Sequence, residues 1–374
     1  MTEITTNPSV LKKRLLSLDV FRGITIATMI LVNDPGDWGH IYAPLEHSKW
    51  NGCTPTDLVF PFFLFMVGVS IVYATESRKE VGADHGKLIG HAFKRMVILL
   101  LINYGMSFIF HPDLSHLRFP GVLPRIAVVY FICTIIYIKT SQKTRDWLFA
   151  IALIGYYIIM NFIPEPGVGY ANLEPTTNMG AWLDRLVFGS NHLWSQSKTW
   201  DPEGILGTLP AIGTGLFGIR LGTWIKRKDI EDSVKVSWMF TFGVISVVLA
   251  LFWDLFFPIN KALWTSSFVL YTGGLATIGL ALSYWWIDVQ GHKKFTAPIV
   301  AFGANAITAY ILADFIPHYL GMIRGDKAGS PFYHAFFISF LSPINASLAS
   351  AVFIVLSIWI VMWVLYKRKI IIKV

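Results

Sequence analysis

One polar segment of this chain, between two apolar runs, carries the side chain best suited to chemistry. From Asp34 it reads DPGDWGHIYAPLEHSKWNGCTPTD, and it places His47 among polar and aromatic side chains. An imidazole exchanges protons near neutral pH, and it can also carry an acyl group. A protein that only crossed a bilayer would have no use for such a group there. The segment therefore indicates chemistry or binding at a membrane face.

The composition indicates the class of protein that must position this segment. The 374 residues are 54% hydrophobic and 14% charged, with a mean hydropathy of +0.55, which argues against a soluble domain. About ten apolar runs approach the roughly twenty residues that a helix needs to cross a bilayer. They are Leu16–Val32, Leu58–Ala74, Phe93–Phe110, Val122–Ile138, Trp147–Ile163, Ile205–Ile225, Val234–Phe257, Trp264–Trp286, Pro298–His318 and Ile344–Tyr366. We predict an all-α polytopic membrane protein, with residues 1–374 as a single transmembrane domain.

The net charge of +8 has a topological explanation. If the spans are threaded from a cytoplasmic N-terminus, most of the 31 Lys and Arg residues fall on the cytoplasmic side, as the positive-inside rule requires. They include Lys12, Lys13, Arg14, Arg78, Lys79, Lys94, Arg95, Lys226, Arg227, Lys367, Arg368 and Lys373. We therefore predict cytoplasmic termini, no nucleic-acid partner, and a His47 segment that faces the periplasm or a lumen. No cleavable signal peptide is expected, because the first run contains Asp19 and Arg22.

Cysteine and histidine spacing gives no sign of a metal site or a disulfide framework. The two cysteines, Cys53 and Cys133, fall on an outer loop and within a span. The chain has no HEXXH motif, and no pair of its histidines has strong ligand spacing. We expect no metal.

A second outer segment, residues 164–204, is long and rich in aromatic residues. Tyr170, Trp182, Trp194 and Trp200 lie there among Asn, Glu and Asp residues. Loops of this length are usually functional or disordered, and the aromatic content argues against disorder. Indole faces beside carboxylates suit a sugar ring, so Trp200 is a candidate substrate contact. The alternative is an aromatic belt at the membrane interface.

Two sequence patterns mark helix starts on the outer face. Thr54-Pro55-Thr56-Asp57 resembles a capping box with proline at the first helical position, and Asp201-Pro202-Glu203 repeats the cap-then-proline pattern. Asp57 and Glu203 thus fit helix-start residues better than general bases. Because both helices point positive dipole ends at the outer loops, we also take Asp57 and Glu203 as candidates for substrate binding.

Arginines within or at the ends of the apolar runs have two interpretations. Arg22, Arg125 and Arg220 could be structural ion-pair or snorkelling residues, since an unpaired charge at the bilayer centre costs about 2.5–3.5 kcal/mol. They could instead form a basic vestibule for a phosphate-bearing cofactor that enters from the cytoplasm. Arginine suits that task because its planar fork meets phosphate oxygens in pairs.

Several ordered motifs resemble one known family. SLDVFRGITIATMILVN, HSKWNG and DLVFPFFLFMVGVSI are similar to the catalytic membrane domain of heparan-α-glucosaminide N-acetyltransferases and their bacterial relatives. FPGVLPRIAVVYF, DPEGILGTLPAI, FPINKALWTSSFVLYTGG and ANAITAYI follow in the family's order. The segment between Asn33 and His47 is longer than in the family, and Lys49 replaces a small residue. We expect no counterpart of the lysosomal enzyme's extra N-terminal domain and leading span.

The resemblance implies acetyl transfer from cytoplasmic acetyl-CoA to the amine of a glucosamine-like sugar on the far side. The family's active-site histidine falls on His47 and its neighbouring asparagine on Asn33. His47 would either take the amine proton or carry the acetyl group itself. Asn33 would donate a hydrogen bond to the thioester oxygen or orient the imidazole. The relatives also imply a bacterial inner-membrane location and a homodimer.

Two rival functions fit the same composition. One is an amino-sugar permease in which His47 and the aromatic segment form an outward gate. The other is an acyltransferase that modifies a lipid or a cell-wall glycan. The HSKWNG segment favours transfer over transport. So does the lack of a convincing internal repeat, because many secondary transporters are built from two.

Overall fold

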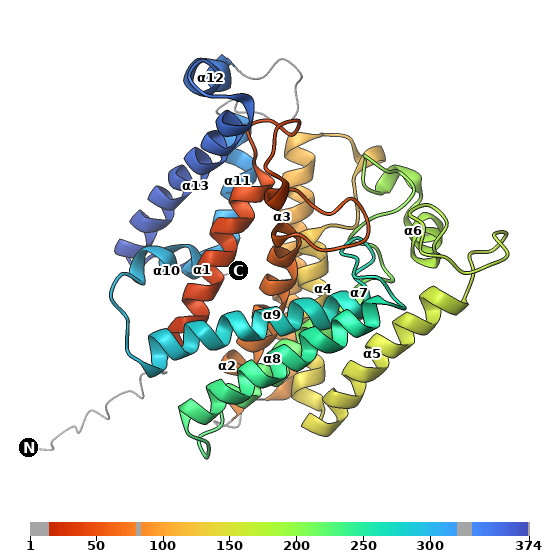
Figure 1. Ribbon diagram of the computed structural model, residues 1–374, viewed down its shortest axis with the longest axis vertical. Helices are drawn as coiled ribbons and strands as arrows, with labels where there is room; N and C mark the ends of the chain where they lie inside the picture. Colours follow the sequence, from red (N-terminus) through yellow and green to blue (C-terminus); the bar gives the residue numbers. More distant parts are fainter. Residues whose placement is uncertain (1–14, 80–83, 320–330, 373–374) are drawn as a thin grey trace, which may run out of the picture.

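The computed structural model describes residues 15–79, 84–319 and 331–372, and every regular element within them is helical (Figure 1). The helices are α1 (Leu16–Asn33), α2 (Val59–Lys79), α3 (His85–Phe110), α4 (Val122–Lys139), α5 (Gln142–Phe162), α6 (Met179–Phe188), α7 (Thr208–Ile225), α8 (Asp232–Asp254), α9 (Ser266–Tyr284), α10 (Ala297–Ala304), α11 (Ala306–Tyr319), α12 (Pro331–Tyr333) and α13 (Pro343–Lys367). The all-α prediction is therefore confirmed for the described residues.

Seven helices in the described ranges are long and apolar enough to cross a membrane, which identifies an integral membrane protein. They contain α1, α2, α3, α4, α8, α9 and α13, and α10 with α11 could form an eighth, broken span. Two further predicted runs form the helices α5 and α7. The count of about ten spans stays a prediction.

The predicted cytoplasmic location of both termini also stays a prediction. Several of the basic residues on which this prediction of topology depends lie outside the described residues. Residues 12–14 and Lys373 lie outside the described residues, as do the side chains of Arg78 and Lys79.

Close helix contacts depend on glycine at two crossings. A Cβ on Gly218 of α7 would lie 2.0 Å from the carbonyl oxygen of Phe65 in α2. A Cβ on Gly303 of α10 would lie 2.3 Å from the carbonyl oxygen of Asp19 in α1. Since no side chain fits at these points, α2 packs directly on α7 and α1 on α10, as small residues permit in membrane bundles.

The run Pro298–His318, predicted as one span, is broken. Its helices α10 and α11 meet at an angle of 83° beside Asn305. The side-chain amide of Asn305 donates to Ile370 O at 3.0 Å, and its oxygen accepts from Ile372 N at 2.9 Å. The chain beyond α13 thus returns to the bundle and pairs with the asparagine at the break. A side chain engaged in this way accounts for a sharp kink in an apolar helix.

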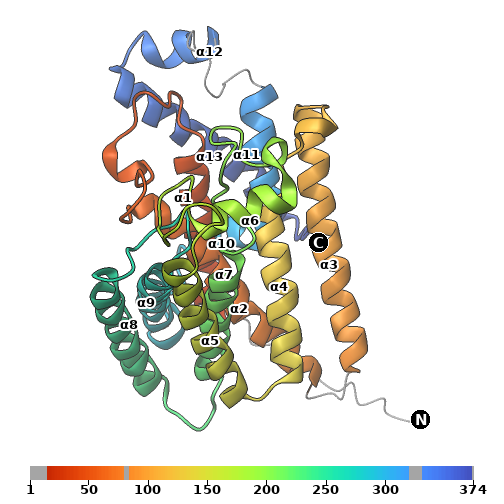
Figure 2. The same ribbon diagram turned by 90° about the vertical axis from the view of Figure 1, so that its right-hand side faces the viewer.

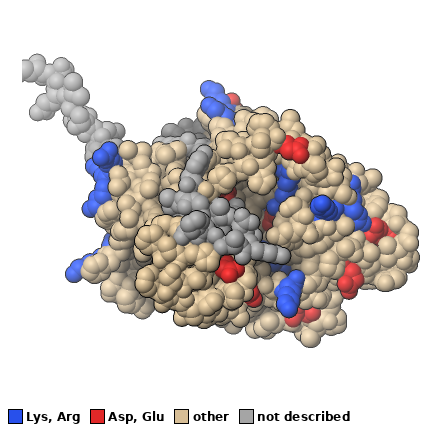
Figure 3. Space-filling view, turned by 90° about the horizontal axis from the view of Figure 1, so that it is seen from above, with Lys and Arg blue, Asp and Glu red and all other residues tan. Residues whose placement is uncertain are grey.

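The long segment 164–204 contains α6 and a short turn, η4 (Ser190–His192). Asn178 caps α6 by accepting from Ala181 N at 2.9 Å, and Arg185 binds Glu165 at 2.7 Å. This segment, the His47 segment and the loops before α4 and α9 lie at one end of the long helices (Figure 2). Seen from above, Lys, Arg, Asp and Glu side chains stand out on a largely uncharged surface (Figure 3).

The predicted orientation of the loop-bearing end is testable by labelling. Glu46 is exposed beside His47, so a Glu46→Cys protein in intact cells should react with an impermeant maleimide if this end faces outward. Burial raises the pKa of the native Cys53 thiol to about 12, which suppresses its reaction and keeps the background low. If labelling requires permeabilised cells, the loop-bearing end faces the cytoplasm and the predicted orientation is wrong.

Candidate active site

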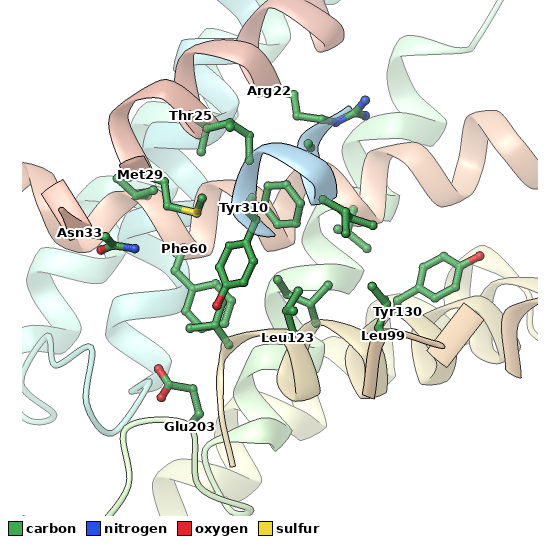
Figure 4. Close-up of a pocket in the computed structure, with 18 of the residues that line it drawn as sticks. Arg22, Thr25, Met29, Asn33, Phe60, Leu99, Leu123, Tyr130, Glu203 and Tyr310 are labelled. Atoms are coloured by element: carbon green, nitrogen blue, oxygen red, sulfur yellow. The ribbon is translucent and has the colours of Figure 1, made fainter. Parts of the chain in front are cut away.

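In the described part of the chain, a large cavity joins the loop-bearing end to the far ends of the helices. Its volume is 2190 Å³, against a usual upper value of about 1,000 Å³ for small-ligand sites. Residues of α1, α2, α3, α4, α10 and α11 line it, and Figure 4 shows residues of α1 and α4 facing the same space as Tyr310 and Glu203. Its wall includes both Lys87 near the start of α3 and His111 just beyond its end. At about 1.5 Å per residue, this helix is roughly 39 Å long. The cavity therefore suits a long ligand that enters from one end and reacts at the other.

The imidazole of His47 lies at the loop end of the cavity and is held from behind by Asp57. Its Nδ1 is 2.7 Å from Asp57 Oδ1, and the Asp57 side chain is 1% exposed. The other carboxylate oxygen accepts from Ser48 N at 3.0 Å and from Thr54 N at 2.9 Å. This is the capping box before α2, so one carboxylate both starts the helix and fixes the ring. With Nδ1–H donating to the carboxylate, Nε2 is the nitrogen left with a lone pair.

The HSKWNG segment is docked on the loop between α8 and α9. Gly52 N donates to Ile259 O at 2.7 Å, and Asn260 Nδ2 donates to Asn51 Oδ1 at 3.1 Å. Gly52 has φ +108°, a left-handed conformation that favours glycine. The docking brings Lys261 to the cavity wall, with Nζ 3.1 Å from His47 Nδ1 and 3.2 Å from Nε2.

Aromatic and acidic side chains complete the loop end. The Trp200 ring lies 5.0 Å from that of Trp50 and 5.2 Å from that of Trp194, and all three residues line the cavity. Glu203 points into the cavity (Figure 4) and accepts from Arg118 Nη2 at 2.6 Å. Arg118 Nε also donates to Asp201 at 2.8 Å. The end thus offers flat apolar faces beside a fixed carboxylate.

Comparison with known proteins identifies the family of this chain. The family model described as heparan-alpha-glucosaminide N-acetyltransferase, catalytic, matches residues 14–255, which is more than half of the chain. The chain belongs to this N-acetyltransferase family. It is 29% identical to the human heparan-alpha-glucosaminide N-acetyltransferase over 366 residues and to the mouse protein over 361. These alignments cover 83% and 82% of this chain and 54% of each relative, so the chain spans about half the length of both.

Within this member of the family, the cavity brings six of the eight predicted site residues together. They are Arg22, Asn33, His47, Asp57, Trp200 and Glu203. Asn33 is exposed on the cavity wall at the end of α1, and in the described part of the chain its side chain makes no hydrogen bond with His47. The contact that orients the imidazole comes from Asp57.

Two predicted cofactor contacts are not on the cavity wall. Arg125 is 3% exposed, and its guanidinium donates to Pro202 O at 3.0 Å and Gly204 O at 2.8 Å, which anchors the chain before α7. Arg220 lies 3.5 Å from Asp146 in an ion pair whose side chains are about half exposed. Both arginines therefore have structural partners, and neither lines the cavity.

A basic stripe on α3 lines the far end and was not among the predicted site residues of this family member. It comprises Lys87, His91, Lys94 and Arg95, whose spacing places them on one helix face. From the sequence, Lys94 and Arg95 were predicted only to be topological charges. Arg22 lies on the same cavity and donates to Ser70 Oγ at 2.7 Å. Among the described residues, no group of three His, Cys, Asp or Glu side chains could hold a metal ion.

Proposed function

We propose that this protein transfers an acetyl group from cytoplasmic acetyl-CoA to the amine of a glucosamine-like sugar on the periplasmic side of a bacterial inner membrane. The observation that carries the proposal is the position of the His47–Asp57 pair at one end of a cavity whose other end is basic. Membership of the N-acetyltransferase family supports the reaction class.

The site chemistry follows from the imidazole. A protonated amine has no lone pair, so a base must take a proton before the nitrogen can attack the thioester. His47 Nε2 is the ring nitrogen that can do this, because Nδ1 faces Asp57. The new C–N bond forms, the C–S bond breaks, and the nitrogen loses a second proton. Of the two protons, one passes to the leaving thiolate and the other is released to solvent. In the alternative route, Nε2 attacks first and His47 carries the acetyl group to the sugar.

We place the phosphates of acetyl-CoA at the basic stripe of α3, with Arg22 further along the cavity towards His47. Lysine and arginine side chains there match phosphate charge. At the loop end, Trp50, Trp194 and Trp200 offer apolar faces for a sugar ring. The fixed carboxylate of Glu203 would hold the sugar ammonium. Asn33, on the wall beside the acetyl path, would donate to the thioester oxygen.

Charge removal on the cavity wall should weaken binding of acetyl-CoA. We expect Arg22→Gln and Lys94→Gln to raise the apparent KM for acetyl-CoA about tenfold, the equivalent of about 1.4 kcal/mol, while the KM for the sugar changes little. Acetyl-pantetheine, which lacks the nucleotide, should show a smaller effect for Lys94→Gln. Arg220→Gln is the control, because Arg220 lies off the cavity wall. Equal KM changes for all three variants would contradict the placement.

A thiol-release assay tests the function itself. Purified protein in detergent is mixed with acetyl-CoA and glucosamine, and free thiol and N-acetylated sugar are followed. Transfer needs no sealed membrane, whereas a permease would act only on vesicles. Stoichiometric release of thiol and acetyl sugar supports the proposal. Glucosamine uptake into vesicles without either product would support the permease.

A further inference from the structure

Lys261 has no assigned role, yet it is the cation nearest to His47 in the described structure. It belongs to the motif FPINKALWTSS, which lies 214 positions along the chain from the imidazole. Its Nζ is 3.7 Å from Asp57 Oδ1, and its side chain is 20% exposed at the cavity wall. Asn260, which is fully buried, fixes the turn by accepting from Leu263 N at 2.9 Å. The fixed turn therefore holds the backbone of Lys261 in place and directs its amine to the cavity wall.

The contact leaves the basic nitrogen of His47 available. The two ring nitrogens point in different directions, so an amine at 3.1 Å from one and 3.2 Å from the other is aligned with neither lone pair. Lys261 thus lies beside the reacting nitrogen without occupying it. A group in this position can contact a substrate that is bound to Nε2.

The charges around the amine favour its protonated form, while burial opposes it. Desolvation lowers the pKa of Lys261, and the carboxylates of Asp57 and Glu203 act in the opposite direction. The groups that face Lys261 are His47, Asp57, Glu203 and Cys53. A partly desolvated ammonium interacts strongly with any negative charge that forms near it.

We infer that Lys261 is a catalytic residue whose ammonium stabilises the negative charge that develops on the acetyl carbonyl oxygen. This inference rests on the proposed function. As the sugar nitrogen bonds to the carbonyl carbon, the C=O electron pair moves onto oxygen and the amine proton moves to His47. The oxyanion then collapses, C=O re-forms, and the C–S bond breaks with the proton passing to the thiolate. An ammonium about 3 Å from the base reaches that oxygen.

The test compares length-matched variants of two cavity lysines. Lys261→Met should lower kcat about 10²–10³-fold, the loss typical for one oxyanion donor, with little change in the KM for acetyl-CoA. Lys49→Met is the control, since Lys49 also lines the cavity but makes no contact with His47 in the described residues. It should stay within about threefold of wild type in kcat, well below the loss of an oxyanion donor. A normally eluting Lys261→Met protein with wild-type kcat would overturn the inference, as would an equal loss in Lys49→Met.

Lys261→Arg keeps the inference testable if the methionine variant does not fold. The arginine variant should keep at least about a tenth of wild-type kcat, whereas removal of an oxyanion donor typically lowers kcat about 10²–10³-fold. Lys261 loses its charge as pH rises through its lowered pKa, whereas guanidinium stays charged. Activity of the arginine variant relative to wild type should therefore increase at alkaline pH. A constant ratio would overturn the inference. An inactive wild-type protein would instead refute the proposed function.

Discussion

His47→Ala should reduce acetyl transfer about 10²–10⁴-fold, and further if the imidazole carries the acetyl group. The variant loses the only imidazole of the described structure that lies beside Lys261 and Asp57 on the cavity wall. Binding of acetyl-CoA should persist, because the cavity walls and the basic stripe are unchanged. The measurements are kcat from thiol release and the affinity for CoA of protein that elutes as wild type.

The control for this variant is on the same segment. His40 Nδ1 lies 2.7 Å from Asp37, the same distance as in the His47–Asp57 pair, but His40 does not line the large cavity. His40→Ala should therefore keep wild-type kcat. Near wild-type activity in His47→Ala would show that His47 has no catalytic role. Acetyl-His47 trapped in wild-type protein without acceptor would favour the covalent route over direct attack.

Asp57→Asn should cost nearly as much activity as removing His47, without unfolding the segment. The backbone amides of Ser48 and Thr54 need an acceptor, so the asparagine oxygen will face them. Its NH₂ group then faces His47 Nδ1 and favours the tautomer with hydrogen on Nε2, which is not a base. In serine protease triads the same exchange lowers kcat about 10⁴-fold by this effect, and we expect about 10³–10⁴ here.

The exposed pair again supplies the control for Asp57→Asn. Asp37→Asn alters a His–Asp contact of equal length outside the large cavity, so kcat should not change. The KM for acetyl-CoA should stay near wild type in both variants. If Asp57→Asn loses sugar binding while kcat is kept, Asp57 contacts the substrate as the sequence suggested. A loss of kcat alone would identify it as the residue that orients His47.

Much of this protein is specified by local sequence. Hydropathy over about twenty residues is enough to identify a membrane helix, because each such helix satisfies its own backbone hydrogen bonds. The capping box at Thr54–Asp57 was predictable for the same reason, since its partners lie within three residues. His47 was predicted from its residue type, its segment and the family resemblance, and the family from ordered motifs across the chain.

Contacts between distant residues required the tertiary structure. The contact of Lys261 with His47 joins residues 214 positions apart, and no local propensity encodes it. The break at Asn305 depends on Ile370 and Ile372 returning to the bundle. Hydropathy alone shows only a continuous apolar run there.

The positions of the charged side chains also required the tertiary structure. The sequence identified arginines that could meet a phosphate, but only helix packing decided which of them line the cavity. Arg22 does, whereas Arg125 is bound to backbone carbonyls before α7 and Arg220 pairs with Asp146. Asp57 was predicted as a helix start and substrate contact, and the folded loop places its carboxylate behind His47. Residue type and spacing determined which groups were available, and packing of helices far apart in sequence decided which of them meet.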